Sequence, residues 1–205
     1  MKKTFLVPFL LMFFYLSNAQ EVYFTHGKNL TNYEQLQSTS SSNLPIERGI
    51  GSSFEIGYKS KYIKNTSFFY TLGLAYNQFN AMGKSIGINM EWKTNYIGLN
   101  TAFNYSFIQS KRSDLSLRLG TSMQTLVYGK QEINLVQNDI LNNREFSGFN
   151  IGLQSGLVYN FQINSDCGVN LGYTYVQLFN LSNNTPEKSI LTNQNLSVGF
   201  TVKIK

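Results

Sequence analysis

The sequence has little of the residues from which reactive and metal sites are built. Its 205 residues include one cysteine, Cys167, and one histidine, His26. A single cysteine excludes an internal disulfide and any metal site made of several thiolates, and it is ordinarily a lone buried thiol. No group of His, Cys, Asp and Glu residues has the spacing of metal ligands. We therefore expect no metal and no cofactor.

Charge is also scarce, and the excess of positive over negative residues is small. Charged residues make up 14% of the chain, and the formal net charge is +6 at pH 7. It falls to +4 if Lys2 and Lys3 leave with an N-terminal signal. So small and scattered an excess does not indicate a nucleic-acid partner.

Long apolar runs are lacking except at the start of the chain. Lys2 and Lys3 precede an apolar stretch over 4–16, and Ser17-Asn18-Ala19 ends in a small residue before Gln20. This order predicts a secretory signal over 1–19, cleaved between Ala19 and Gln20. A retained membrane anchor is the alternative, but it needs about 20 apolar residues. Residues 20–205 then form one domain that is either soluble or crosses the membrane as strands.

The sequence is rich in period-two alternation, which separates the two faces of a strand. In 149–161, large apolar residues occupy nearly every second position, and Gly, Asn and Gln stand between them. Seven further segments alternate in the same way, with 22–31 the weakest: 22–31, 50–59, 67–77, 97–107, 115–128, 168–180 and 195–204. Lengths of 10 residues or more exceed the usual strand of about 5–6 residues and suit a tilted membrane-spanning strand.

The connections between these segments alternate between short and long. Those at 60–66, 109–113 and 162–166 are short, and those at 32–48, 78–95, 129–147 and 181–193 are longer. Outer-membrane barrels have short periplasmic turns and longer external loops. We therefore predict an outer-membrane location with both termini in the periplasm.

Alternation alone does not say which face points outward, because a lipocalin-like soluble barrel carries its apolar face inside. Here the polar face is mostly small residues, which suit a narrow lumen, and the apolar face is large and aromatic toward the strand ends. The prediction is an all-β fold, namely an eight-stranded antiparallel up-and-down transmembrane β-barrel. A soluble periplasmic or secreted barrel is the alternative.

Four motifs, taken in order, resemble a known family, the porin-like outer-membrane β-barrel domain proteins common in Bacteroidetes-type bacteria. They are Gly27-Lys28-Asn29-Leu30-Thr31-Asn32, Asn95-Tyr96-Ile97-Gly98-Leu99, Leu115 to Gly120 followed by Tyr128, and Leu171-Gly172-Tyr173-Thr174-Tyr175. The resemblance implies a fold and a location, and little about activity. The chain departs from the family at Gly98 and Asn100, where Glu and Pro are usual. It also ends on Ile204-Lys205, where an aromatic residue recognised during assembly is common.

Two charges on the polar face mark a candidate site. Glu55 and Arg118 fall in mid-strand, and a buried charge is costly unless it is paired. We predict a structural polar network in the lumen, with Lys59 or Tyr96 as alternatives for a further partner. Its members are Glu55, Arg118, Tyr96, Asn100, Asn104, Asn150 and Gln154. Plugging of the barrel is its main interpretation, because eight strands leave little more room than their own side chains need. A gate or narrow conduit is the alternative.

We expect no catalytic residues. His26 could join Ser and Glu as in some outer-membrane lipid hydrolases, but no spacing motif marks such partners. The expected role is structural or surface-binding, since loops on a rigid scaffold commonly carry function. Alternatives are an accessory barrel of an envelope secretion or gliding machine, and a lipid-modifying enzyme. Expected partners are outer-membrane lipid, the barrel-assembly machinery during biogenesis, and an envelope protein or extracellular ligand at the loops.

Overall fold

The computed structural model describes residues 20–36, 46–61, 67–85, 88–141, 148–181 and 188–204. The predicted signal over 1–19, with Ala19, lies outside the described residues, and Gln20 is the first residue of β1. The described residues form nine strands: β1 (Gln20–Leu36), β2 (Ile46–Lys61), β3 (Phe68–Ser85), β4 (Ile88–Gln109), β5 (Ser113–Ile133), β6 (Val136–Asp139), β7 (Phe149–Gln162), β8 (Cys167–Asn180) and β9 (Lys188–Ile204). The described ranges contain no helix that could span a membrane.

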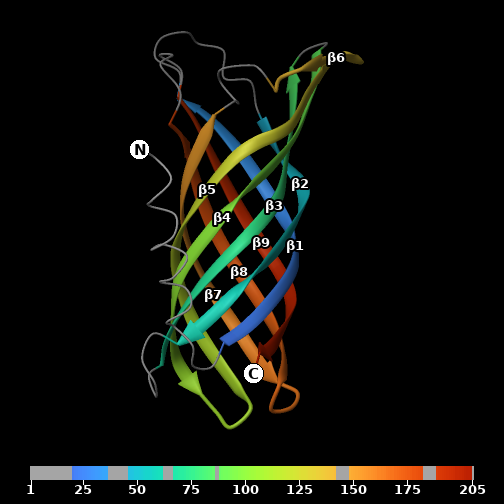
Figure 1. Ribbon diagram of the computed structural model, residues 1–205. Coiled ribbons are helices and arrows are strands. Elements are labelled where there is room, and N and C mark those ends of the chain that lie inside the picture. Colours follow the sequence, from blue (N-terminus) through green and yellow to red (C-terminus); the bar gives the residue numbers. More distant parts are fainter. Residues whose placement is uncertain are drawn as a thin grey trace, which may run out of the picture.

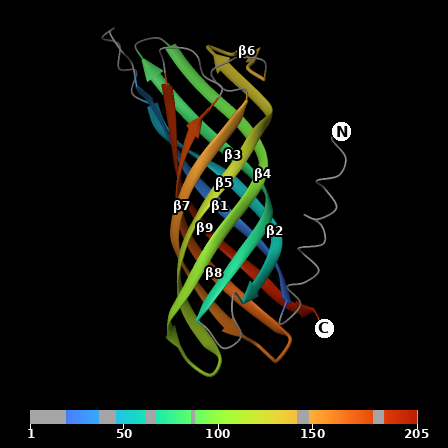
Figure 2. The ribbon, with the colours of Figure 1, turned by 60° about the vertical axis from the view of Figure 1, so that its left-hand side comes forward.

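Eight of these strands close into an antiparallel barrel. Hydrogen-bonded neighbours follow the order β4-β3-β2-β1-β9-β8-β7-β5, and pairing of β4 with β5 closes the ring (Figures 1 and 2). The remaining strand, β6, lies outside the barrel wall. It pairs only with the last residues of β5 and forms a hairpin with them above the barrel (Figure 1). The prediction of an eight-stranded up-and-down barrel is confirmed.

The two ends of the barrel differ. The turn end carries the short connections β4–β5 and β7–β8, together with Gln20 and Ile204 (Figure 1). The last residue of β2, Lys61, and the first of β3, Phe68, also lie at the turn end, whereas the loop end carries the β5–β6 hairpin and the ends of β1, β3 and β8.

The register of the strands sets the width of the barrel. A row of paired residues that starts at Val22 and passes once round the barrel returns to β1 at Asn32, ten residues further along. With a rise of about 3.3 Å per residue and about 4.8 Å between strands, this displacement tilts the strands by about 40°. The same numbers put the backbone about 8 Å from the barrel axis. Side chains from facing walls therefore meet across the lumen.

The apolar face of every strand points outward. Large hydrophobic residues remain exposed on all eight barrel strands, for example Phe24, Ile56, Leu74, Phe103, Leu119, Leu153, Leu171 and Val198. The inward positions between them are buried Asn, Ser, Thr, Gln and Gly over most of the lumen. This arrangement is the reverse of a lipocalin-like barrel.

The predicted loop over 78–95 is wrong. Strand β3 continues to Ser85 and β4 begins at Ile88, with backbone pairing up to Ser85 opposite Ile88. Polar residues such as Gln78 and Asn80 occupy outward positions of this extension, so the apolar alternation is lost on its outer face. The backbone pairing of β3 with β4 nevertheless continues. Backbone pairing, which the composition does not reveal, defines the strand there.

Strands β1, β2, β5 and β9 also extend further toward the loop end than the alternation predicts, whereas β7 and β8 begin and end there as predicted. The β5–β6 hairpin occupies part of the loop predicted over 129–147. Strand β1 runs to Leu36, and β9 starts at Lys188. The predicted short turns at 109–113 and 162–166 lie where the chain does turn, between β4 and β5 and between β7 and β8.

Candidate functional site in the barrel lumen

An ion pair crosses the lumen near its middle. Strand β2 places Glu55 and β5 places Arg118 on inward positions, and Arg118 Nη2 lies 3.3 Å from Glu55 Oε1. The Arg118 side chain is 12% exposed and the Glu55 side chain 14% exposed, so both charges are largely removed from solvent. The second carboxylate oxygen, Oε2, accepts a 2.6 Å hydrogen bond from Asn100 Nδ2 on β4.

Tyr23 completes this layer, and the prediction from sequence missed it. Its hydroxyl donates to Glu55 Oε1 from the inward face of β1. Room for the ring comes from two facing glycines: a Cβ at Gly57 or at Gly73 would lie 2.5 Å from the Tyr23 hydroxyl oxygen. Glu55 thus receives hydrogen bonds from three strands besides its own. We call Tyr23, Glu55, Asn100 and Arg118 the charged layer.

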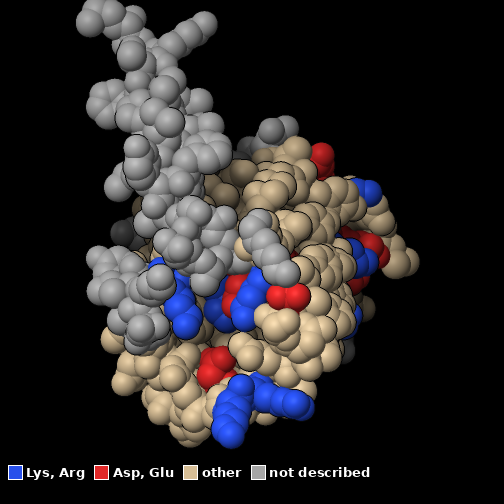
Figure 3. Space-filling view, turned by 60° about the horizontal axis from the view of Figure 1, so that its bottom comes forward, with Lys and Arg blue, Asp and Glu red and all other residues tan. Residues whose placement is uncertain are grey.

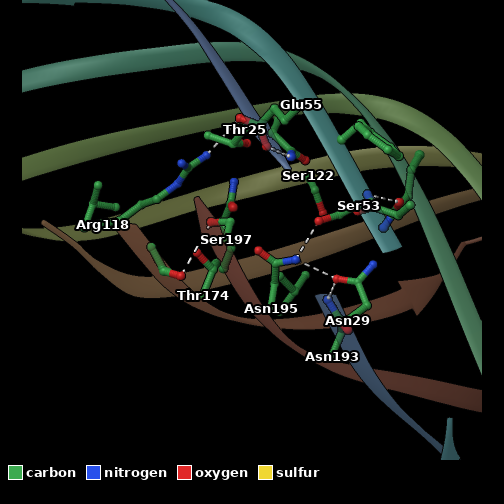
Figure 4. A pocket seen from close by; sticks show the side chains of 18 of the residues that line it. Thr25, Asn29, Ser53, Glu55, Arg118, Ser122, Thr174, Asn193, Asn195 and Ser197 are labelled. Atoms are coloured by element: carbon green, nitrogen blue, oxygen red, sulfur yellow. Dashed lines mark hydrogen bonds and ion pairs between the residues drawn. The ribbon is translucent and has the colours of Figure 1, made fainter. Parts of the chain in front are cut away.

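An amide cluster lies on the loop-end side of the charged layer and joins the first strand to the last. Asn29 Oδ1 accepts hydrogen bonds from Asn193 Nδ2 at 3.0 Å and from Asn195 Nδ2 at 2.8 Å. Asn195 Nδ2 also reaches Ser53 Oγ at 2.7 Å. Figure 4 shows these side chains converging from β1, β2 and β9. Buried amides satisfy one another here, as buried polar groups must.

The loop end of the lumen is apolar, which the prediction of a polar lumen missed. Phe79, Tyr96, Leu126, Leu178 and Leu191 form a buried cluster, and partly buried Tyr33 and Val176 pack against it. The rings of Phe79 and Tyr96 lie 5.4 Å apart at a tilt of 46°. The lumen is therefore polar in its middle and closed by hydrophobic packing above.

A cavity of about 70 Å³ lies between the charged layer and the apolar cluster (Figure 4). Glu55, Arg118, Asn195 and Ser122 line it, together with Phe79. Among the described residues, Arg118 Nε and Ser122 Oγ have no hydrogen-bond partner. One water needs roughly 10–15 Å³ of such space, so the cavity is sized for a few water molecules rather than for an organic ligand.

The structure brings together some of the predicted network and separates the rest. Glu55, Arg118 and Asn100 share the charged layer. Gln154 lines the same cavity and donates to the backbone oxygens of Thr101 at 3.2 Å and of Thr121 at 3.0 Å. Asn150 is buried without contributing to the charged layer, and its Nδ2 has no partner among the described residues.

The remaining predicted residues lie elsewhere. Asn104 is buried and donates to Thr71 Oγ1 at 3.4 Å. Tyr96 belongs to the apolar cluster, and Lys59 pairs with Glu21 at 3.3 Å near the turn end. Neither is therefore the further partner of Glu55; Tyr23 is.

His26 stands on the outer face, away from the lumen. Its ring lies 4.5 Å from that of Phe54, and Nδ1 is 3.0 Å from the Ser53 backbone oxygen. In the described part of the chain no group of three or more His, Cys, Asp or Glu side chains is arranged to hold a metal ion. The lumen offers a buried charge pair, amides and hydroxyls, which suit fixed hydrogen bonding.

The architecture of the chain is similar to that of a known protein. Neisserial surface protein A (NspA) has a crystal structure that is similar with a TM-score of 0.53 and 16% identity, over 92% of this chain and 100% of that one. OprG of Pseudomonas aeruginosa follows with a TM-score of 0.47 and 11% identity, over 91% and 97% of the two chains. The attachment invasion locus protein Ail of Yersinia pestis has a TM-score of 0.43 and 12% identity, over 90% and 99%. No protein-family model matches the chain, and no curated protein matches it in sequence. At these identities the likeness to NspA shows the fold alone.

Proposed function

We propose that this chain is a small integral outer-membrane protein with a structural or surface-binding role and a plugged lumen. The observation that carries the proposal is the continuous apolar outer face on all eight barrel strands. A monomeric soluble protein rarely exposes an apolar patch beyond about 300–600 Å². The proposal places both termini in the periplasm and assigns assembly of the barrel to the envelope's barrel-assembly machinery. It includes membership of the porin-like family that the motifs resemble.

The height of the apolar face supports lipid as its environment. Along β4 the outward hydrophobic residues run from Ile97 to Phe107, interrupted only by Thr101. Ten residues at about 3.3 Å each, tilted by about 40°, span about 25 Å along the barrel axis. The apolar band of outer-membrane barrels is about 25 Å tall. We call this outer surface the apolar belt.

The first test is cell fractionation with gel mobility before and after heating. We expect the protein in the outer-membrane pellet, migrating as a compact species until it is boiled. A product that stays in the soluble fraction would overturn the proposal.

A second test uses Leu119, which lies on the apolar belt and is 53% exposed. Leu119→Lys places a charge in lipid and is expected to destabilise the barrel by about 2–4 kcal/mol, whereas Leu119→Phe changes stability little. On a water-facing surface the lysine would be tolerated, so equal stability of the two variants in lipid vesicles contradicts a lipid environment.

A specific feature of the loop end favours surface binding as the form of this role. The tip of the β5–β6 hairpin carries Leu135 and Val136, which are 89% and 62% exposed. Asn134 and Leu135 adopt positive φ angles of 47° and 70°. A left-handed leucine is an unfavourable choice for a turn with no other task. We therefore propose that the tip contacts an envelope protein or an extracellular ligand, as an accessory barrel of an envelope machine would.

Cross-linking in intact cells tests the tip. Leu135→Asp is expected to abolish the specific cross-linked adduct between this protein and its partner. Asn138→Ala on the neighbouring strand serves as the matched control and should leave the adduct unchanged. An unchanged adduct in the Leu135 variant removes the tip from the proposal.

We propose no enzymatic role, because His26 lies on the outer face with an aromatic neighbour and a backbone oxygen as its contacts. Comparison of lipid A from a deletion strain and its parent tests this proposal. A change in acylation that the wild-type gene restores and a His26→Ala variant does not would reverse it.

A further inference from the structure

The turn end of the barrel contains a cavity much larger than the one in the lumen. It measures about 480 Å³, whereas the cavity in the lumen measures about 70 Å³. Sites for small ligands generally measure about 300–1,000 Å³. The walls come from the turn ends of β1, β2 and β9 and from the β4–β5 turn. We call this cavity the basal cavity.

The basal cavity is strongly cationic. Five cationic side chains and two carboxylates line it, which leaves a net charge of +3; they are Lys59, Lys61, Lys111, Arg112 and Lys203 against Glu21 and Asp114. Figure 3 looks onto this end and shows blue Lys and Arg atoms gathered there with fewer red carboxylate residues between them.

The two carboxylates already have partners. Glu21 lies 3.3 Å from Lys59. Asp114 Oδ1 accepts hydrogen bonds from Ser106 Oγ at 3.1 Å, Ser116 Oγ at 2.8 Å and Asn160 Nδ2 at 2.9 Å. Between described residues, Lys61, Lys111, Arg112 and Lys203 form no ion pair. Four cations are therefore left to attract an anion.

The positions of these cations direct them toward the cavity. Lys59 and Lys61 follow Glu55 on the inward-facing positions of β2, and Lys203 occupies an inward-facing position of β9. Lys111 and Arg112 extend from the exposed β4–β5 turn at the rim. Lysines on the outer face would instead meet lipid headgroups.

Positive charge is also concentrated at this end when all the described residues of the two ends are compared. Among the described residues, the strand ends and turns at the turn end carry five cationic and three acidic residues: Lys59, Lys61, Lys111, Arg112 and Lys203 against Glu21, Asp114 and Asp166. The described strand ends at the loop end carry five of each sign: Arg48, Lys84, Lys93, Lys130 and Lys188 against Glu34, Glu47, Glu91, Glu132 and Asp139. A cavity lined by one sign of charge raises the local concentration of the opposite ion.

We propose that the basal cavity binds an anion with two or more acidic groups, phosphates or carboxylates, which two or more of Lys61, Lys111, Arg112 and Lys203 hold together. Serine hydroxyls at Ser67, Ser110 and Ser113 line the same cavity and supply neutral donors. The inference is independent of the role proposed for the loop end.

Titration of purified protein with inorganic pyrophosphate tests the proposal, with binding followed calorimetrically in zwitterionic detergent. We expect saturable binding that weakens as salt is raised. Lys111→Gln/Arg112→Gln removes two cations from an exposed turn without touching the strands, and should weaken binding by about fivefold or more. Lys93→Gln/Lys130→Gln at the loop end removes the same charge and should leave binding unchanged.

A second arm separates a free anion from a lipid headgroup as the source of the phosphate. Micelles doped with phosphatidylglycerol should leave pyrophosphate binding intact if the cavity admits soluble anions, and should displace pyrophosphate if headgroups enter it. Either result supports the anion site. Absence of saturable binding, or equal weakening in the two double variants, overturns it. Heat-modifiable mobility verifies that each variant is folded.

Discussion

Removal of Glu55 should cost more stability than removal of Arg118. Glu55→Ala leaves the Arg118 guanidinium, 12% exposed, without its carboxylate, and leaves Tyr23 and Asn100 without their acceptor. Breaking a buried pair in this way costs about 3–5 kcal/mol. Arg118→Ala leaves the carboxylate without its counter-charge, but Tyr23 and Asn100 still donate hydrogen bonds to it, so the expected loss is smaller, about 1.5–3 kcal/mol.

Unfolding by urea in lipid vesicles measures both losses. The chain has a single tryptophan, Trp92 on β4, whose fluorescence reports on closure of the barrel wall without added labels. The double variant should lose less than the sum of the two single losses, because the residues share one network. If Arg118→Ala costs as much as Glu55→Ala, or if neither shifts the transition, the charged layer does not hold the lumen together as argued.

Four further outcomes follow from the described contacts. Gly73→Ala should destabilise the barrel by about 1–3 kcal/mol in the same assay, because its Cβ would lie 2.5 Å from the Tyr23 hydroxyl oxygen; a neutral effect would mean that the ring moves freely. Asn29→Ala should cost about 1–3 kcal/mol, since it leaves buried amide donors of β9 unpaired, and an unchanged urea midpoint would contradict this. Leu135→Gly should raise the free energy of unfolding by about 0.5–1 kcal/mol, because glycine tolerates a φ of 70°, and a lower midpoint would show that leucine is favoured there. Planar-bilayer recordings should show no steady conductance for the wild type or for Arg118→Ala, since the apolar cluster closes the lumen independently; stable channels in either protein would favour the conduit interpretation.

The fold was predictable because alternation depends on each residue and its neighbours two positions away. Segments such as 149–161 carry enough apolar residues at every second position to define a strand without knowledge of its partners. The strand extensions were missed for the complementary reason. Gln78 and Asn80 are polar on the outer face, and pairing with β4 makes them a strand.

The site was predictable only in part. Glu55 and Arg118 are conspicuous because charges are rare on the inward face of mid-strand segments. Tyr23 was missed because β1 has the weakest alternation, so its inward face was poorly defined. The cluster of Asn29, Asn193 and Asn195 depends on residues more than 160 positions apart, and on a register that only the closed barrel defines. The one signal available in the sequence was that asparagines recur at inward positions of both the first and the last strand.

Closure of the barrel by its two terminal strands also constrains how the protein is made. Each residue of β1, from Gln20 to Leu36, pairs with a residue of β9, from Ile204 back to Lys188. During synthesis the first strand therefore emerges long before its partner exists, with its backbone donors and acceptors unmatched and its apolar side chains exposed. Bringing such distant segments together carries the loop-closure entropy that slows the folding of non-local β structure. The chain must therefore be kept from aggregating until its last residues have been synthesised. Removal of the final strand alone should leave an open sheet edge, because no earlier part of the sequence can pair with it.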